Sequence, residues 1–286
     1  MSRAVDFRSA AASTTGRWGL RIGLALVVAL GLVSLAAPIV VSADPTFESP
    51  AGLTVSGEPL PFLSAGHPLG TDPKGRDLLA RVVYGGRVTL FAAIVAVAIA
   101  MLIGLAIGSL GAAFPRRIGA VLMRFTDLGL AIPGVLLAAA IAAVLGRGVV
   151  ALVLGLAGVF WAPLARVTYG QAIVVRERTF VEAARAQGAS PLFVLRRHVL
   201  PHVLPVVIAY AALSVGWAVL FESALGFLGA GVQEPTPSIG GLLGCCLIYY
   251  RSQPGLILFP TIYLALLVTA ANLVGEGLRR PLEGGR

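Results

Sequence analysis

The residues that could carry catalytic chemistry are few and poorly spaced for it. Cys245 and Cys246 are adjacent and have no other cysteine to pair with, and His198 and His202 lack a third ligand. Neighbouring thiols seldom bridge each other, and neither pair makes a good metal site. The sequence also has no G-x-x-x-x-G-K-[ST] phosphate loop, no Gly-x-Ser-x-Gly elbow and no His-Glu-x-x-His motif. We therefore expect no enzyme activity, no metal site and no cofactor bound by this chain.

Three charged side chains lie within or beside long apolar segments, where a charge is costly and usually has a purpose. Arg124 and Asp127 are three residues apart and share a helix face, and Glu222 lies near the end of a later apolar segment. Arg124 and Asp127 form either a mutual ion pair or snorkelling contacts that fix helix packing, or part of a gate or solute pathway. Glu222 either hydrogen-bonds to the segment that follows it or faces the pathway.

The composition indicates an integral membrane protein. Hydrophobic residues make up 57% of the chain, charged residues only 12%, and the mean hydropathy is +0.90. A soluble domain has about 25% charged residues, because it needs them to cover its surface. The net charge of +9 does not indicate a nucleic-acid partner, because the arginines lie between apolar runs and form no single basic face.

The lengths of the apolar segments predict the fold class, because a helix of about 20 mostly apolar residues crosses a bilayer. We expect an all-α integral membrane protein with six transmembrane helices, at residues 18–41, 87–114, 118–145, 148–166, 203–225 and 255–276. The first segment lacks a short apolar core followed by an Ala-x-Ala cleavage site, so we expect a retained helix rather than a removed signal peptide.

Helix breakers and small residues modify these spans. Kinks are expected where proline interrupts a span, at Pro133, Pro163, Pro205 and Pro260. Gly104 and Gly108 form a small-xxx-small pair, which predicts a close approach between two helices.

The positive-inside rule predicts the orientation. If the N-terminus is cytoplasmic, the inner segments hold 15 of the 22 Lys and Arg residues and the outer segments hold 6. We therefore expect cytoplasmic tails at 1–17 and 277–286 and a cytoplasmic loop at 167–202. Residues 42–86 are expected to form an irregular extracytoplasmic loop. Residues 226–254 contain an apolar run too short to span, which predicts a re-entrant or interfacial segment.

The predicted cytoplasmic loop carries strong helix signals of its own. Thr179 and Glu182 fit a capping box, which predicts a helix of about two turns over 180–187. Gly188 fits the position after the helix that favours a left-handed backbone. Ser190 and the proline after it fit the start of a second helix leading to the fifth span.

This short helix has the features of a docking element. Ala183 and Ala184 lie next to each other and let a partner's backbone come close, while arginines on either side add electrostatic attraction. Glu182 has a simpler interpretation as a cap of its own helix, and the alanines as good helix formers. A capped helix between two spans nevertheless favours contact with something outside the membrane.

The same residues resemble a known family. Glu182-Ala-Ala, then Gly188, then Leu200-Pro201 looks like the EAA loop of bacterial ABC importer permeases. Further matches to the dipeptide, oligopeptide and nickel permease subfamily lie at 67–77, 86–87, 124–127 with Pro133, 222–229, 237–238 and Asn272. The resemblance covers roughly 67–280 and favours the C-type permease subunit. His202 and the carboxyl-terminal residues 282–286 depart from the pattern, which leaves the contacts of the tail open.

The resemblance implies a type I ABC importer transmembrane domain in the bacterial cytoplasmic (inner) membrane, with its permease core at 87–276. Its partners would be a second homologous permease subunit, two ATPase subunits or domains that bind ATP and Mg, an extracytoplasmic substrate-binding protein and the lipid bilayer. The residues expected to couple the permease to the ATPase are Thr179, Phe180, Glu182, Ala183, Ala184, Gly188, Ser190, Leu200 and Pro201.

The solute stays open at this point. Dipeptides or oligopeptides are the main expectation for this subfamily, and nickel chelates or haem-like ligands are the alternative. A different class of protein, a self-contained secondary transporter or channel, would require inverted repeats or a coupling-ion site, and the sequence shows neither.

Overall fold

The computed structural model describes residues 4–41, 43–114 and 116–283, and its regular structure is helical throughout those residues. The α-helices are α1 (Ala4–Leu35), α2 (Ala37–Val40), α3 (Leu78–Ala113), α4 (Arg116–Ala131), α5 (Gly134–Leu145), α6 (Val149–Arg176), α7 (Thr179–Ala186), α8 (Pro191–Val194), α9 (Leu200–Phe227), α10 (Ile239–Cys246) and α11 (Gly255–Glu283). Short 3₁₀ turns lie at Pro50–Gly52 and Leu247–Tyr249, and a π-helical turn lies at Leu195–Val199.

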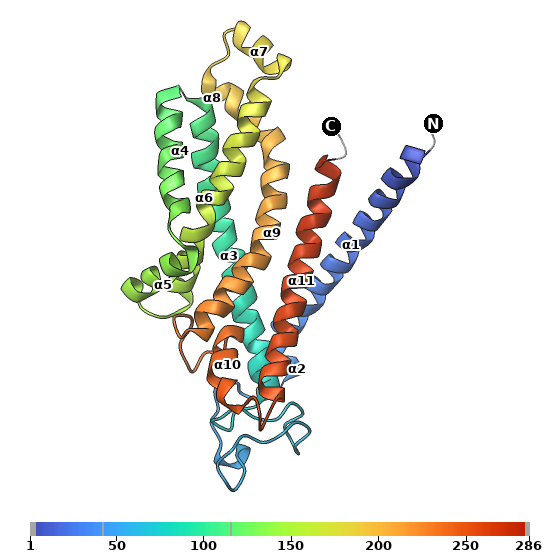
Figure 1. The fold of residues 1–286 in the computed structure, drawn as a ribbon, viewed down its shortest axis with the longest axis vertical. Coiled ribbons are helices and arrows are strands. Elements are labelled where there is room, and N and C mark those ends of the chain that lie inside the picture. The colour runs from blue at the N-terminus through green and yellow to red at the C-terminus, as the bar shows by residue number, and fades with distance from the viewer. Residues whose placement is uncertain (1–3, 42, 115, 284–286) are drawn as a thin grey trace.

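The long helices form an elongated bundle (Figure 1). Five of the described helices are long and apolar enough to cross a membrane, and α4 with α5 makes a sixth span if the bent pair counts as one. The predicted all-α fold with six spans is therefore confirmed. The two ends of the chain and α7 lie at one end of the bundle, and α10 lies with the irregular segment before α3 at the opposite end (Figure 1).

The helices extend beyond the predicted spans, so the helix ends do not coincide with the predicted span boundaries. α3 begins at Leu78 rather than 87, because the Asp77 carboxylate accepts a hydrogen bond of 2.8 Å from the backbone N–H of Ala80 and caps the helix. α6 continues to Arg176, and α8, the π-helical turn and α9 form one unbroken helical run. The loop predicted at 167–202 is therefore much shorter. Hydropathy marks the part of a helix that matches the bilayer, and the backbone hydrogen bonds continue past it.

The third span is broken rather than kinked. α4 and α5 meet at an angle of 88°, and Pro133 stands at the N-cap of α5. A proline cannot donate the backbone hydrogen bond that would join the two helices, and it disfavours helical geometry in the residue before it. Pro163 and Pro205, in contrast, lie inside the continuous helices α6 and α9.

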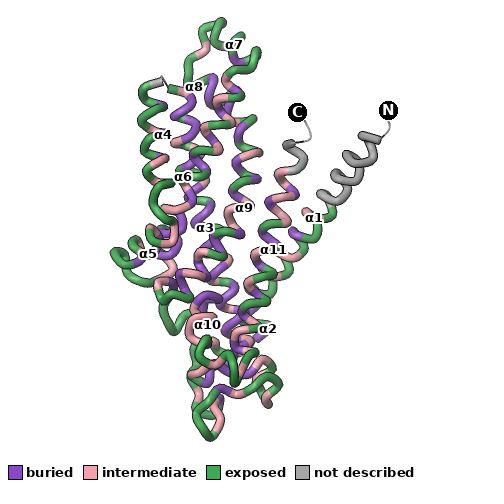
Figure 2. The backbone as a smooth tube through the Cα atoms, viewed as in Figure 1, coloured by how far each residue is buried: buried purple, intermediate pink, exposed green. Residues whose placement is uncertain are grey.

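The contact between α3 and α6 is the centre of the bundle. Buried residues concentrate along α3, α6 and α9 (Figure 2). Gly104 and Gly108 both lie on this contact: a Cβ added to Gly104 would come within 2.8 Å of Leu164 Cβ, and one added to Gly108 within 2.5 Å of the carbonyl oxygen of Ala165. The two backbones therefore touch, and the predicted close approach is confirmed.

A buried charge network closes the end of the bundle opposite α7. Asp72 is fully buried and pairs with Arg76 at 2.6 Å and with Arg81 at 3.1 Å. Glu234, which precedes α10, pairs with Arg76 at 2.7 Å and with Lys74 at 2.5 Å. These contacts fasten the irregular segment before α3 to the segment that carries α10. The short helix α10 is buried at Ile239 and Leu242 and is too short to span, as the sequence predicts.

Replacing Gly108 with alanine is expected to destabilise the protein by about 1–3 kcal/mol, because the added methyl group forces α3 away from α6. Alanine is the better helix former, so propensity alone predicts the opposite sign. Gly170→Ala is the matched control, because nothing lies within 4 Å of a Cβ added there. Unfolding of the purified protein in detergent measures both; equal stability of the two variants would contradict the backbone contact.

Acid is expected to open the charge network. Although partial burial opposes ionisation, hydrogen bonds from Arg76 and Lys74 lower the pKa of Glu234 from 4.5 to about 2. Because the folded-state pKa is the lower one, this stabilisation is complete above pH 4.5 and is lost as the pH falls towards 2. Hydrogen exchange in the segment before α3 is expected to accelerate over this interval in the wild type. Glu234→Gln should remove that contribution to the pH dependence, and an unchanged profile would contradict it.

Candidate functional site

The helix α7 projects from the bundle between the end of α6 and the start of α8 (Figure 1). Two residues, Glu177 and Arg178, separate α6 from α7. Val181 is completely buried and belongs to the main hydrophobic core together with Val175, Val194 and Val199. A single apolar side chain therefore fixes this short helix to the long helices on both sides of it.

The predicted capping box is wrong, whereas the other two end signals are confirmed. α7 begins at Thr179 itself, and the N-cap is Arg178, which makes no side-chain cap. Glu182 is an exposed acidic residue in the first turn, where it interacts favourably with the helix dipole. At the other end, Gly188 has φ +84° and the N–H of Ala189 bonds to the carbonyl of Ala184 at 3.1 Å, a Schellman motif.

Ser190 caps the second helix as predicted. Its side-chain oxygen accepts a hydrogen bond of 3.3 Å from the backbone N–H of Phe193. The helix then continues through the π-helical turn, where the N–H of Leu200 bonds to the carbonyl of Leu195. Pro201, which has no N–H to donate, follows this turn directly. α8, the π-helical turn and α9 therefore form one continuous helical element.

A groove of about 680 Å³ runs along one face of α7 and continues onto α8. Five of the nine predicted coupling residues line it: Phe180, Ala183, Ala184, Gly188 and Ser190. The other lining residues are Gln187, Ala189, Phe193 and His198. Its α7 residues follow the spacing i, i+3, i+4 and i+7 of a single helix face. Thr179 and Glu182 do not line this groove, and neither do Leu200 and Pro201, which begin α9. We call this hollow the α7 groove.

The floor of the α7 groove contains ring contacts that sequence reasoning missed. The ring of Phe180 stacks on His202, with ring centroids 5.3 Å apart and an interplanar angle of 29°. Phe193 meets His198 edge-on at 5.9 Å. The two histidines thus hold the start of α7 against the start of α9. Among the described residues no cluster of His, Cys, Asp or Glu has the makings of a metal site. The i, i+4 spacing of the histidines was visible in the sequence, but their aromatic partners were not.

The expected ion pair between Arg124 and Asp127 is wrong. Asp127 instead forms an ion pair with Arg166, which lies inside α6 rather than at the end of a span as predicted. Arg124 is exposed on α4. The side chains of Asp127 and Arg166 are 45% and 41% exposed, so the pair stands on an open face of the bundle. Asp127 therefore pairs with Arg166 of α6 and not with Arg124 of its own helix, because the Arg166 guanidinium contacts the carboxylate directly.

Glu222 is completely buried and follows the packing interpretation. Its carboxyl group accepts a hydrogen bond of 3.3 Å from Ser223, and the hydroxyls of Thr89 and Ser238 lie beside it. Ser238 is the N-cap of α10, where its side chain accepts from the N–H of Gly241. Glu222 therefore joins α3, α9 and the non-spanning segment, and it presents no open face to a solute.

Comparisons with known proteins agree with this architecture. Residues 100–283 match the family described as binding-protein-dependent transport system inner membrane component. The chain is 34% identical to a dipeptide transport system permease protein of Alkalihalophilus pseudofirmus over 92% of this chain and 84% of that protein. It is 38% identical to a probable D,D-dipeptide transport system permease protein of Escherichia coli over 78% of this chain and 76% of that protein.

Solved structures show the same fold. A chain from inward-facing conformations of the MetNI methionine ABC transporter superposes with a TM-score of 0.60 at 22% sequence identity, covering 72% of this chain and 96% of that one. The resemblance to ABC importer permeases, first carried by a few motifs, is thereby confirmed over most of the chain. The chain belongs to the family of binding-protein-dependent transport system inner membrane components.

Proposed function

We propose that this chain is half of the translocation pathway of an ATP-driven importer and that α7 couples the pathway to a separate ATPase. The observation that carries the proposal is the α7 groove. Small side chains at Ala183, Ala184 and Gly188 open it to a partner, and the buried Val181 ties α7 to α6 and α8. A partner that holds α7 and changes shape on binding ATP would then move the long helices, which is a coupling free energy between two sites.

The orientation and the partners belong to the same proposal. The end that carries α7 and both termini would face the cytoplasm, in keeping with the excess of arginine at that end. Two ATPase subunits binding ATP and Mg would meet this end. A second, homologous permease subunit would complete the pathway, and a substrate-binding protein would deliver solute at the opposite end. A chain without phosphate-binding motifs leaves hydrolysis to those partners.

Peptides are the proposed solutes. The relatives at 34% and 38% identity are named for the transport of dipeptides and D,D-dipeptides, and they overlap 92% and 78% of this chain. These names favour peptides over nickel chelates and haem-like ligands as the solutes. A self-contained secondary transporter would need no docking groove on α7. Transport by this chain in vesicles that lack any ATPase would contradict the importer proposal.

Enlarging Ala183 is expected to uncouple transport. In Ala183→Leu the larger side chain fills the α7 groove, so the ATPase should no longer copurify and ATP-dependent dipeptide uptake should fall at least tenfold, the equivalent of about 1.4 kcal/mol of lost binding. Ala186→Leu is the matched control, because Ala186 is exposed on the same helix but does not line the groove. Equal uptake by the two variants would show that the groove is not the docking site.

The pair of Asp127 and Arg166 is proposed to line the pathway, and a charge swap tests this against a packing role. Asp127→Ala removes the partner of Arg166 and should lower thermal stability, because an unpaired charge within a span is unfavourable. Asp127→Arg combined with Arg166→Asp restores the attraction but reverses the field met by a charged solute. We expect the double variant to regain thermal stability and not uptake. Recovery of both would assign the pair to packing alone.

A further inference from the structure

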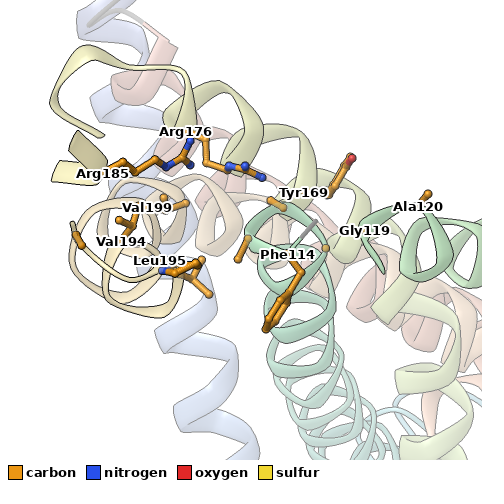
Figure 3. A pocket seen from close by; sticks show the side chains of 14 residues that line it. Phe114, Gly119, Ala120, Tyr169, Arg176, Arg185, Val194, Leu195 and Val199 are labelled. Carbon is orange, nitrogen blue, oxygen red and sulfur yellow. The ribbon is translucent and has the colours of Figure 1, made fainter. Parts of the chain in front are cut away.

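A second pocket, of about 660 Å³, lies between α7 and the ends of α3, α4 and α6, and it shares only Ala189 with the α7 groove. Figure 3 shows the side chains that line it. Its walls come from the end of α3, the first turns of α4, the end of α6 and the helical run from α8 onward. It therefore sits where three membrane-crossing helices meet the aqueous layer. No solute pathway or docking contact described above uses it.

Two arginines give this pocket an unbalanced positive charge. Arg176, the last residue of α6, and Arg185, on α7, both line it, and they lie next to each other along one wall (Figure 3). Neither arginine forms an ion pair with any residue that the structure describes. Two neighbouring guanidinium groups without a counter-ion fit an anion such as phosphate, which both can bind by paired N–H donors.

The remaining walls are apolar. Phe114 is 42% exposed at the end of α3, and Val194, Leu195 and Val199 line the opposite side. Figure 3 shows the phenyl ring and these aliphatic side chains below the two arginines. An inorganic anion would satisfy the charge but leave the exposed ring of Phe114 uncovered, whereas Val194, Leu195 and Val199 are already buried in the protein core. A molecule with a phosphate at one end and a hydrocarbon chain at the other would cover both.

We propose that this pocket binds the headgroup of an anionic phospholipid, with the phosphate between Arg176 and Arg185 and the upper part of an acyl chain against Phe114. Basic pockets between helices at a membrane surface bind such headgroups. The lipid would contact α3, α6 and α7 together, so it would help to fix α7 on the bundle. The site is independent of which solute the importer carries.

Native mass spectrometry of the purified full-length chain in neutral detergent tests the proposal. The probes are phosphatidylglycerol and phosphatidylcholine with identical acyl chains. The wild type is expected to retain phosphatidylglycerol and not phosphatidylcholine. Arg185→Gln and Arg176→Gln should each lower the retained fraction about fivefold, the effect of one basic residue near a lipid surface. Arg185→Lys keeps the charge and should retain more than Arg185→Gln.

Arg178→Gln is the matched control, because it removes an arginine two residues beyond Arg176 that does not line the pocket. Equal losses in Arg178→Gln and Arg185→Gln would overturn the proposal in favour of diffuse attraction. Displacement of the lipid by millimolar inorganic phosphate would overturn it in favour of a free-anion site. Size-exclusion profiles establish that each variant is folded, and Arg185→Gln carries the test alone if Arg176→Gln is not, because Arg185 is exposed.

Discussion

The buried contact of Val181 is the constraint on which the position of α7 depends. A helix of eight residues is too short to be stable alone in water. It persists here because Val181 is completely buried in the hydrophobic core that also contains valines of α6, α8 and the π-helical turn, and because Phe180 stacks on His202 at the start of α9. The α7 groove lies on the face that Phe180 shares with Ala183 and Ala184, and the small residues of that face remain accessible to a partner. The buried Val181 thus holds α7 in place without filling the groove.

Rigid rods connect this end to the rest of the bundle. α6 runs without a break from Val149 to Arg176, and it is held to α3 by the glycine contact at Gly104 and Gly108. α9 reaches the far end, where Glu222 joins it to α3 and to the cap of α10. The charge network around Asp72 then fixes the irregular segment over that end. A displacement of α7 has a continuous packed route to both ends of the bundle.

The sequence predicted the features that depend on neighbouring residues or on overall polarity. The number of spans followed from apolar length. Gly188 ends a helix through its left-handed backbone and Ser190 begins one through its side-chain cap, and both effects act within one turn. Thr179 failed as a cap because the chain leaves α6 by a tight turn and Arg178 takes the N-cap position. The helix ends near Leu78 and Arg176 were missed because hydropathy reports the bilayer and not the hydrogen-bond ladder.

Contacts between residues far apart in the chain could not be predicted from the sequence. Asp127 has Arg124 nearby on its own helix, yet it pairs with Arg166, 39 residues further along the chain. The groove could be assigned to the correct loop, but only folding places Phe193 and His198 beside Ala183. The pocket with Arg176 and Arg185 likewise depends on how α7 folds back over the end of α3.

We propose that α7 docks into a partner ATPase through the groove lined by Phe180, Ala183, Ala184, Gly188 and Ser190. Electron cryomicroscopy of the complex purified with its native partners can locate that contact. We expect partner atoms in contact with Ala183 and Gly188, and Val181 still buried between α7 and the rest of the bundle. A complex in which this groove faces solvent, with the ATPase held by another part of the chain, would contradict it.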